Sequence, residues 1–273
     1  MSTIGLALKV YSVVPCKNIL IPIHTPEHAL IAVERAFELY PFADTTLYLS
    51  GTGCVQRKWS LLKWRKTVTA VPDHAMINKL AAKIRSVYPG SRVLVETPAD
   101  EQPDETYYWQ LITRHNIDLV LLVKGETENM LPSYASFPVP VLVITPGCLN
   151  HPIRSILLPV HGFVPETQVH ASLMFAKKFN AQIYLVTILG SDETHSKQHV
   201  DAFYLTYKLL MEYGHTPYYK ILQGSHDTEM ILRYADQVKA DLLLTSLERK
   251  RSVTDLLHPL SALQVLMLKP HIK

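Results

Sequence analysis

Two histidines stand at the same place in two similar segments of the chain. His24 ends the segment KNILIPIH, which begins at residue 17, and His161 ends the segment RSILLPVH, which begins at residue 154. Histidine titrates near neutral pH, so each imidazole could contact a ligand or respond to pH. The simpler interpretation is that each one caps the loop that follows. His28 lies four residues after His24, but no carboxylate or cysteine completes a metal-binding spacing, so we expect no metal site.

A basic and aromatic segment, Arg57–Lys66 (RKWSLLKWRK), combines five cations with two tryptophans. Such a segment can bind single-stranded nucleic acid through phosphate pairing and base stacking, or lie on an anionic membrane. The commoner structure is a helical excursion that packs Trp59, Leu62 and Trp64 on the protein and leaves the cations in water. We expect this helix, and on that interpretation nucleic acid is not an expected partner. The corresponding stretch of the second half, 190–197, has no such cluster.

Other residues that could do chemistry have a structural interpretation. Tyr107, Tyr108 and Trp109 open a predicted amphipathic helix, where aromatic residues more often serve a core or an interface than a ligand pocket. Asp118 and Asp241 each precede an apolar strand and are expected to terminate the helix before it. No Ser-His-Asp order, nucleophile elbow or pair of carboxylates stands out. We therefore expect no enzyme activity.

Composition limits the class of protein. The three cysteines, Cys16, Cys54 and Cys148, are scattered and odd in number, which predicts neither a disulfide framework nor a CxxC motif. The net charge of +3 is mild for a nucleic-acid-binding protein. No apolar run approaches the roughly 20 residues that span a bilayer, and residues 1–14 do not read as a secretory signal. These features predict a soluble, cytoplasmic protein.

The elements that position these residues occur twice. The segment that begins at 17 returns at 154, a shift of 137 residues, with Ile, Leu, Pro and His retained. An amphipathic helix follows each copy, with apolar residues three and four apart. The remaining elements then recur in the same order. The expected strands are 46–49, 92–96, 117–123 and 139–144 in the first half, and 182–185, 218–222, 240–245 and 264–268 in the second. The expected helices are 27–40, 73–88 and 105–116, then 166–179, 199–213 and 227–239.

The pattern predicts a fold class. Strands that are apolar without alternation need cover on both faces, which is typical of parallel sheets with helices on either side. Each half therefore reads as a doubly wound, Rossmann-like α/β unit, with a loop and a helix before its last strand. The turn-rich linker PGCLNHP, residues 146–152, divides the chain into domains 1–148 and 149–273. Residues 1–15 form either an added strand or a loose arm.

The order of elements, the proline in each first strand and the closing strand VPVLVI resemble the universal stress protein family, across nearly the whole chain and twice over. The resemblance implies two domains that associate through their last strands as an internal pseudo-dimer. It also implies a site. Family members that bind ATP have an aspartate after the first strand and a G-x-x-G phosphate loop, followed by Gly-Ser or Gly-Thr, after the fourth. Glycines there let backbone amides approach the phosphates.

Both halves depart from that pattern. His24 and His161 stand where the aspartate would be, and the first half offers Gly125 followed by two carboxylates. The second half has no glycine after its fourth strand, but supplies Thr245, Ser246 and the cations 249–251, including Arg249. We therefore predict a stress-response binding or adaptor protein with no cofactor. The alternative is a protein that binds ATP or AMP at an altered site in the second half. Protein partners stay unidentified, and a homodimer stays open.

Overall fold

The computed structural model describes residues 16–23, 25–51, 54–58, 65–69, 74–98, 105–124, 136–147, 151–190, 193–224, 227–246 and 263–269. The elements of the first half are β1 (Asn18–Ile23), α1 (Pro26–Leu39), β2 (Thr46–Gly51), β3 (Cys54–Lys58), β4 (Arg65–Thr69), α2 (His74–Val87), β5 (Arg92–Glu96), α3 (Glu105–Arg114), β6 (Leu119–Val123) and β7 (Val141–Ile144). Those of the second are β8 (Ser155–Val160), α5 (Glu166–Phe179), β9 (Gln182–Leu189), α6 (Glu193–Glu212), β10 (Tyr218–Gln223), α7 (Asp227–Gln237), β11 (Leu242–Ser246) and β12 (Gln264–Leu268).

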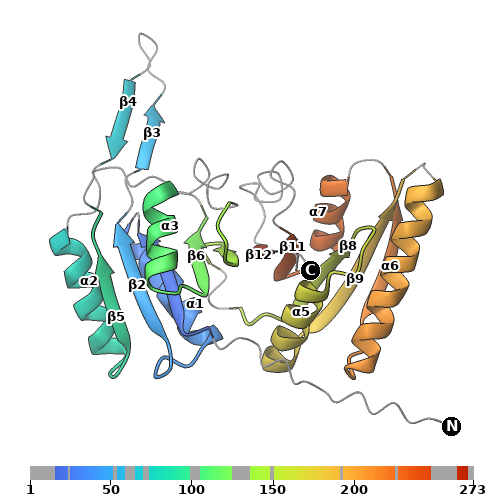
Figure 1. The fold of residues 1–273 in the computed structure, drawn as a ribbon, viewed down its shortest axis with the longest axis horizontal. Coiled ribbons are helices and arrows are strands. Elements are labelled where there is room, and N and C mark those ends of the chain that lie inside the picture. The colour runs from blue at the N-terminus through green and yellow to red at the C-terminus, as the bar shows by residue number, and fades with distance from the viewer. Residues whose placement is uncertain are drawn as a thin grey trace.

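One ten-stranded sheet runs through both halves in the order β10-β9-β8-β11-β12-β7-β6-β1-β2-β5 (Figure 1). In this sheet all pairs within each half are parallel, and the strands follow the order third, second, first, fourth, fifth, which is a doubly wound arrangement. The predicted fold class is confirmed. The expected helix before each last strand, and the domain boundary at 148/149, lie outside the described residues.

The two halves meet through their last strands. β12 and β7 are antiparallel, with Leu266 opposite Leu142 at the centre of the register. This is the internal pseudo-dimer that the sequence predicted. A second link joins the helices of one face, where the Nζ of Lys178 in α5 donates a hydrogen bond to the carbonyl oxygen of Leu39 at the end of α1. A cation at the end of a helix also interacts favourably with the helix dipole.

Two layers of apolar side chains sandwich the sheet. One cluster packs α1, α2, α5 and α6 against one face, and the other packs α3 and α7 against the opposite face. Each cluster contains residues of both halves, for example Leu142 and Leu266 in the first and Val143 and Val265 in the second. The strands are buried on both faces, as their continuous apolar sequences require. In the described part of the chain, no helix combines the length and the hydropathy needed to cross a bilayer.

Local sequence signals set the ends of α1. The side chain of Thr25 accepts a hydrogen bond from the backbone amide of His28 at 3.3 Å, and Pro26 occupies the first helical position. The helix ends at Leu39 because Tyr40, which precedes Pro41, is extended, as residues before proline are. The expected range 27–40 is thus shifted by a single residue.

The described ends of the basic segment, residues 57–58 and 65–66, lie in strands and not in a helix, so the expectation of a helical excursion is wrong for these residues. β3 and β4 form a separate two-stranded antiparallel sheet that projects beyond the end of β2 (Figure 1). The reason lies in its β-branched residues: Val55, Thr67, Val68 and Thr69 favour strand over helix. Trp59, Leu62 and Trp64, which were expected to pack on the protein, lie outside the described residues.

The prediction that Asp118 and Asp241 terminate the helices before them is also wrong. α3 ends at Arg114 and the chain turns at Asn116, whose φ of 46° lies in the left-handed region. Asp118 follows this turn and accepts hydrogen bonds from the amides of Lys17 and Asn18, at 2.8 and 3.0 Å. Its carboxylate therefore fixes the start of β1 beside β6, a contact across about a hundred residues of sequence that local spacing does not reveal.

Candidate functional site

The candidate site lies where each half reverses its strand order. In the second half, β8 and β11 are neighbours, but their pairing covers only the first residues of each strand, ending at Leu157 opposite Leu243. Beyond that point β8 pairs with β9 and β11 pairs with β12. Open α/β sheets place their ligands at this topological switch point, outside the carboxyl ends of the strands. The first half repeats the arrangement, since the pairing of β1 with β6 stops at Leu20 and Val120.

His161 lies at the carboxyl end of β8, as predicted, and is half-buried. Its ring stands edge-on to the ring of His199 in α6, with the ring centroids 6.1 Å apart. The Nδ1 of His199 donates a hydrogen bond to the carbonyl oxygen of Ile188 at 2.8 Å. This bond fixes the tautomer of a neutral His199 and leaves its Nε2 as an acceptor. The two imidazoles form a polar pair that the sequence, which separates them by 38 residues, did not reveal.

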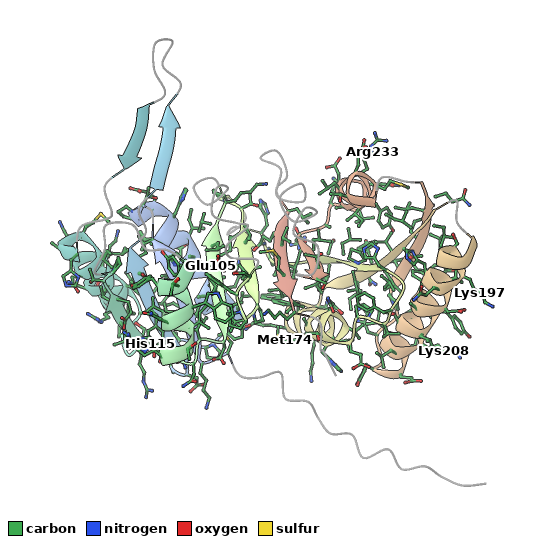
Figure 2. The ribbon with its side chains drawn as sticks, turned by 45° about the horizontal axis from the view of Figure 1, so that its top comes forward. Glu105, His115, Met174, Lys197, Lys208 and Arg233 are labelled. Carbon is green, nitrogen blue, oxygen red and sulfur yellow. The ribbon has the colours of Figure 1, made fainter. Side chains whose placement is uncertain are left out.

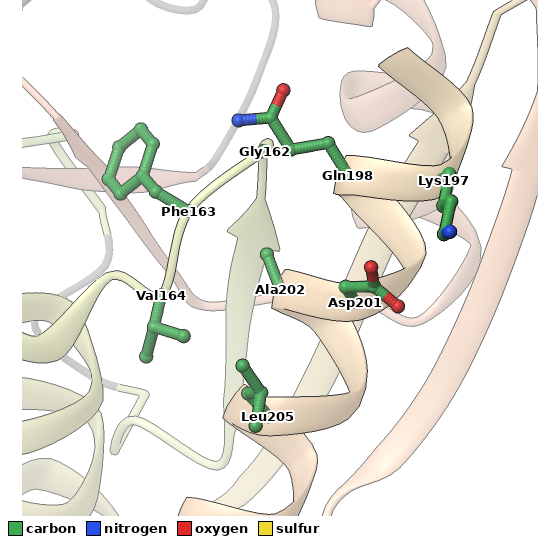
Figure 3. Close-up of a pocket in the computed structure, with 8 residues that line it drawn as sticks. All are labelled: Gly162, Phe163, Val164, Lys197, Gln198, Asp201, Ala202 and Leu205. Atoms are coloured by element: carbon green, nitrogen blue, oxygen red, sulfur yellow. The ribbon is translucent and has the colours of Figure 1, made fainter. Parts of the chain in front are cut away.

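A pocket of about 370 Å³ opens next to this pair. Figure 3 shows that the loop after β8 forms one wall and that residues 197–205 of α6 form the other. Its lining joins apolar groups to polar ones, and the residues are Gly162, Phe163, Val164, Lys197, Gln198, Asp201, Ala202 and Leu205. Gly162 has a φ of 42°, a conformation that favours glycine. Sequence analysis missed this pocket because its walls come from separate elements.

Two further predicted residues of the second half, Thr245 and Ser246, are not among the residues that line this pocket. Thr245 and Ser246 are the last residues of β11, are partly exposed, and stand opposite Met267 and Leu268 of β12. They therefore lie at the predicted switch point, on the other side of β8 from α6. Arg249 lies outside the described residues.

In the first half, two of the predicted residues, His24 and Gly125, lie outside the described residues. The residue before Gly125 is described: Lys124 directly follows β6, and only 4% of its surface is exposed. Its backbone amide donates to the carbonyl oxygen of Ile144 at 2.8 Å. The residue directly after β6 is thus a buried lysine, a feature that the apolar run before it did not predict.

The aromatic residues of α3 belong largely to the core. Tyr108 is buried, and the hydroxyl of Tyr107 lies 3.0 Å from the Oγ of Ser50. Burial raises the pKa of the Tyr107 hydroxyl above its ordinary value, an effect that the bond to Ser50 partly offsets. The prediction of a core role is confirmed for Tyr108. Trp109 is partly exposed.

A further polar cluster was not predicted. His115 follows α3, at the opposite end of that helix from Glu105 (Figure 2). Its Nε2 lies 3.0 Å from a carboxylate oxygen of Glu96, and its ring lies 4.5 Å from that of Tyr48. Burial first, and then the charge of Glu96, raise the pKa of Tyr48. Among the described side chains, no three His, Cys, Asp or Glu residues gather closely enough to hold a metal ion.

Comparison with solved structures gives the class of fold. The chain superposes on a protein of unknown function, PA1789, from Pseudomonas aeruginosa PAO1 (TM-score 0.65, 18% identity, 93% of each chain covered). It also matches a putative universal stress protein from P. aeruginosa UCBPP-PA14 (TM-score 0.62, 19% identity, 93% and 94% covered). A universal stress protein from Archaeoglobus fulgidus matches as well (TM-score 0.61, 11% identity, 93% and 97% covered). No family model and no curated protein matches the sequence.

The chain therefore has the fold of universal stress proteins, and the resemblance inferred from the sequence is confirmed at the level of the fold. Because the matches cover nearly all of each chain, the tandem arrangement is shared along with the single unit. At sequence identities of 11% to 19%, these structural matches show a shared fold and no other shared property.

Proposed function

We propose that this chain is a binding or adaptor protein of the universal stress protein type, which acts through protein partners and does not catalyse a reaction. The observation that carries the proposal is an exposed aromatic surface on the second half. We define the aromatic edge as Tyr204 of α6 with Tyr218, Tyr219 and Ile221 of β10. Exposed groups of aromatic and aliphatic residues mark contact sites, and tyrosine is enriched at protein interfaces.

The aromatic edge is exposed although its residues pack partly on the protein. Tyr219 contacts Phe203 and Tyr207, with ring centroids 6.3 and 5.6 Å apart, yet 62% of its surface is exposed. Tyr218 stacks on Tyr184 at 5.3 Å and is 61% exposed. Rings that are held in place on one side and open on the other lose little conformational entropy on binding. This geometry favours recognition of a protein surface.

The two halves differ at this point. In the first half, α2 covers the outer strand β5, so that Val93 is buried and Arg85 donates a hydrogen bond to its carbonyl oxygen. In the second half, five of the six residues of the corresponding outer strand, β10, are exposed, and the sixth is partly exposed. The second half thus keeps the fold of the first half but leaves its edge strand β10 uncovered. An uncovered edge strand is available to a binding partner.

Site-specific photo-crosslinking in cells tests the adaptor proposal. A photoreactive phenylalanine analogue replaces Tyr219 in one protein and Val87 in another. Val87 is a matched control, because it is 59% exposed and lies on α2 in the other half. We expect discrete crosslinked polypeptides from position 219 and none from position 87. Equal crosslinking at both positions, or at neither, would count against the aromatic edge as the binding surface.

We further propose that neither half binds ATP in the manner usual for the family. The sequence of the first half supports this, because its one glycine after β6, Gly125, is followed by Glu126 and Glu128, carboxylates that would repel a phosphate. In the second half the residues after β11 contain no glycine up to Lys273. The backbone amides that would cradle phosphate therefore lack the glycines that permit close approach.

One observation favours the alternative, adenine-nucleotide binding at an altered site in the second half. The pocket beside Gly162 has enough volume for a small ligand, and it joins Phe163 to Lys197 and Gln198. His161 and His199 lie beside it. An aromatic ring, a cation and donors in one pocket are the groups that a base and a phosphate would use.

Nucleotide binding is tested on protein purified without added nucleotide. Small molecules released by heat are identified by mass spectrometry, and unfolding is monitored with ATP, ADP, AMP and cyclic nucleotides. A ligand present at 100 times its Kd would stabilise the native state by about 2.7 kcal/mol. We expect no released nucleotide and no such stabilisation. Stabilisation that is lost in His161→Ala would establish the alternative, and turnover lost in the same variant would show an enzyme.

A further inference from the structure

The outer strand of the second half is less covered than its counterpart in the first half. In the first half, α2 packs against β5 and β2, the two outermost strands. In the second half, the corresponding helix α6 packs against β9 and β8, one strand further from the edge. This shift of one strand explains why Tyr219, whose ring contacts α6, and Ile221, which points to the same side of β10, are exposed.

The backbone of β10 also lacks a protection that β5 has. The side chain of Arg85 in α2 donates a hydrogen bond to the carbonyl oxygen of Val93 in β5 at 2.5 Å. Among the described residues, no side chain hydrogen-bonds to the backbone of β10. The strand contains a single charge, Lys220, and no proline, whereas exposed edges are usually protected by charges, proline or a covering element. The edge of β10 is therefore able to pair with another strand.

The difference between the two edges of the sheet favours a second copy of the chain as the partner. The ten-stranded sheet ends at β10 and at β5, and of these two strands only β10 is uncovered. Two open edges would allow copies to add without limit, whereas a single open edge pairs with itself in a two-fold interface that closes at two copies. The chain already contains an antiparallel join of this kind, between β7 and β12.

The sequence of β10 restricts the register of such a pair. A two-fold axis places one residue opposite its own copy. Because β10 has six residues, Tyr218–Gln223, only the registers centred on Lys220 and on Ile221 pair five of them, 218–222 or 219–223. The first register opposes two lysines, and like charges directly opposite each other are destabilising. With Ile221 at the axis, Lys220 stands opposite Leu222 of the second copy, and the ring of Tyr219 reaches Ile221 of the second copy on the diagonal.

The exposed surface has the size that a stable dimer requires. Tyr204, Tyr218 and Tyr219 are 55%, 61% and 62% exposed. At about 200 Å² for each tyrosine, their exposed parts come to roughly 350 Å² in each copy. Ile221 of β10 and Met211 of α6 extend this surface, with 41% and 43% of their own surfaces exposed. Two copies together then bury on the order of 1,200 Å², which lies within the range of specific, stable interfaces.

The large rings also suit the space between the two copies of α6. In the paired sheet, two β10 strands separate β9 from its copy, and neighbouring strands lie about 4.8 Å apart. The two α6 helices, which lie over β9 and β8, are then at least about 14 Å apart, whereas helices in direct contact lie about 8–10 Å apart. Small side chains would leave a gap there. The rings of Tyr204 and Tyr219 from both copies fill it.

We propose that two copies of this chain associate through β10, which pairs antiparallel with β10 of the second copy about a two-fold axis at Ile221. The large sheet then continues through both copies, and the aromatic edge of each copy is buried against the other. This inference rests on the proposed function, because it takes the aromatic edge as a protein-binding surface, and it names the partner of that surface.

Analytical ultracentrifugation of the full chain, between about 1 and 100 μM, tests the proposal. We expect the unaltered chain to reach twice the mass of one copy as its concentration rises. Ile221→Lys places two like charges opposite each other at the axis. We expect it to weaken dimerisation by about 30-fold or more, as the loss of a central interface residue does.

A matched control separates the β10 edge from a general effect of added charge. Leu94→Lys makes the same change in net charge on β5, the corresponding strand of the first half, and Leu94 is 46% exposed where Ile221 is 41% exposed. We expect this control to dimerise like the unaltered chain. An unaltered chain that stays monomeric at the highest concentration, or an equal loss in both variants, would overturn the proposal.

A disulfide test reads the register without disrupting the interface. Ile221→Cys and Lys220→Cys are each made with Cys54→Ser and Cys148→Ser, so that the new thiol is the only cysteine besides the buried Cys16. Directly opposed residues of antiparallel strands have Cα atoms about 4.5–5.5 Å apart, which a disulfide bridges. The two copies of Lys220 would be diagonal neighbours, about 7–8 Å apart, which is too far.

After mild oxidation we expect a covalent dimer of the Ile221→Cys protein on a non-reducing gel, and none of the Lys220→Cys protein. A covalent dimer of the Lys220→Cys protein, or its absence from the Ile221→Cys protein, would overturn the proposed pairing.

Self-association and the adaptor role fail in different ways. If the purified chain is monomeric and position 219 crosslinks a different polypeptide in cells, the self-pairing is overturned and the adaptor role stands. If the purified chain is dimeric and position 219 crosslinks only to another copy of the chain, the self-pairing stands and the adaptor role of this surface fails.

Discussion

Asp118 and Asp241 occupy the same place in the two halves. Each carboxylate accepts hydrogen bonds from two consecutive backbone amides at the start of the first strand of its half. Asp118 Oδ2 accepts from residues 17 and 18 at 2.8 and 3.0 Å, and Asp241 Oδ2 accepts from residues 154 and 155 at 2.7 and 2.9 Å. A single aspartate side chain thus joins the first strand to the fourth in each half. The duplicated geometry indicates one structural role, performed twice.

Removal of either carboxylate should destabilise the protein. In Asp118→Ala and in Asp241→Ala two backbone donors lose a charged acceptor, which corresponds to about 1–3 kcal/mol. We expect similar decreases in the free energy of unfolding, measured by urea titration. Asp236→Ala is the control, because Asp236 is exposed on α7. If Asp236→Ala lost as much stability as Asp118→Ala and Asp241→Ala, the hydrogen bonds to these two carboxylates would have no specific energetic role.

The join between the halves should be energetically coupled. Leu142 and Leu266 stand opposite each other across β7 and β12, and are 1% and 5% exposed. Each change to alanine should cost about 2–5 kcal/mol, and residues in contact typically couple by about 0.5–3 kcal/mol. A double-mutant cycle in urea measures the coupling. Leu142→Ala with Leu158→Ala is the control pair, separated by two strands of the sheet, and should be additive. Additivity of the first pair would show that this contact does not couple the two halves.

The sequence predicted the elements well because periodicity and strand composition are local signals. The strands 92–96 and 264–268 and the helix 166–179 have the predicted ends, whereas α6 begins six residues before its expected start at 199. The early residues of α6 are polar, and no apolar period marks them. The error at the basic segment Arg57–Lys66 has a similar source, because its cations and tryptophans matched a surface helix, whereas the β-branched residues of β3 and β4 favour strands.

The site was less predictable, because its contacts are distant in sequence. The position of His161 followed from the repeat, but its contact with His199 depends on how α6 packs over β9. Asp118 reaches back a hundred residues to Asn18, and no spacing rule predicts that contact. Lys124 is buried although lysine is seldom buried in proteins. These features are products of tertiary packing.

Stability should fall as the pH decreases from 7.5 to 5.5, in part through His215. Burial lowers the pKa of His215 below its ordinary value of 6.5, and no described residue pairs with its Nε2. The unfolded chain therefore binds this proton at a higher pH than the folded chain. By linkage, the contribution is fully present above pH 6.5 and is lost as the pH falls through that value towards the folded pKa.

His215→Gln should reduce the slope of the unfolding free energy against pH in that range, measured by urea titration at several pH values. His151→Gln replaces an exposed histidine and serves as the control. A slope that is the same in His215→Gln and in the unaltered chain would contradict the assignment.

Cys16 should resist alkylation in the folded protein. Burial first, and then the charge of Asp118, raise the pKa of this thiol to about 12, while a hydrogen bond with Tyr40 opposes the shift. At pH 8 its thiolate fraction is thus roughly a thousandfold below that of a thiol of pKa 9. Because the thiolate is the nucleophile, we expect iodoacetamide to modify Cys16 in urea but not in buffer, as measured by peptide mass spectrometry. Ready modification in buffer would show that the site opens.

Two variants give opposite expectations for the same thiol. Tyr40→Phe removes the hydrogen bond that lowers the pKa of Cys16, so alkylation should become slower still. Asp118→Asn removes a nearby negative charge, which should lower that pKa and accelerate alkylation at pH 9. Local opening would accelerate alkylation in both variants, because each loses a contact. An alkylation rate of Cys16 that decreases in Tyr40→Phe and increases in Asp118→Asn would therefore exclude local opening as the cause. It would show that the carboxylate of Asp118, which fixes the start of β1, also keeps the Cys16 thiol unreactive.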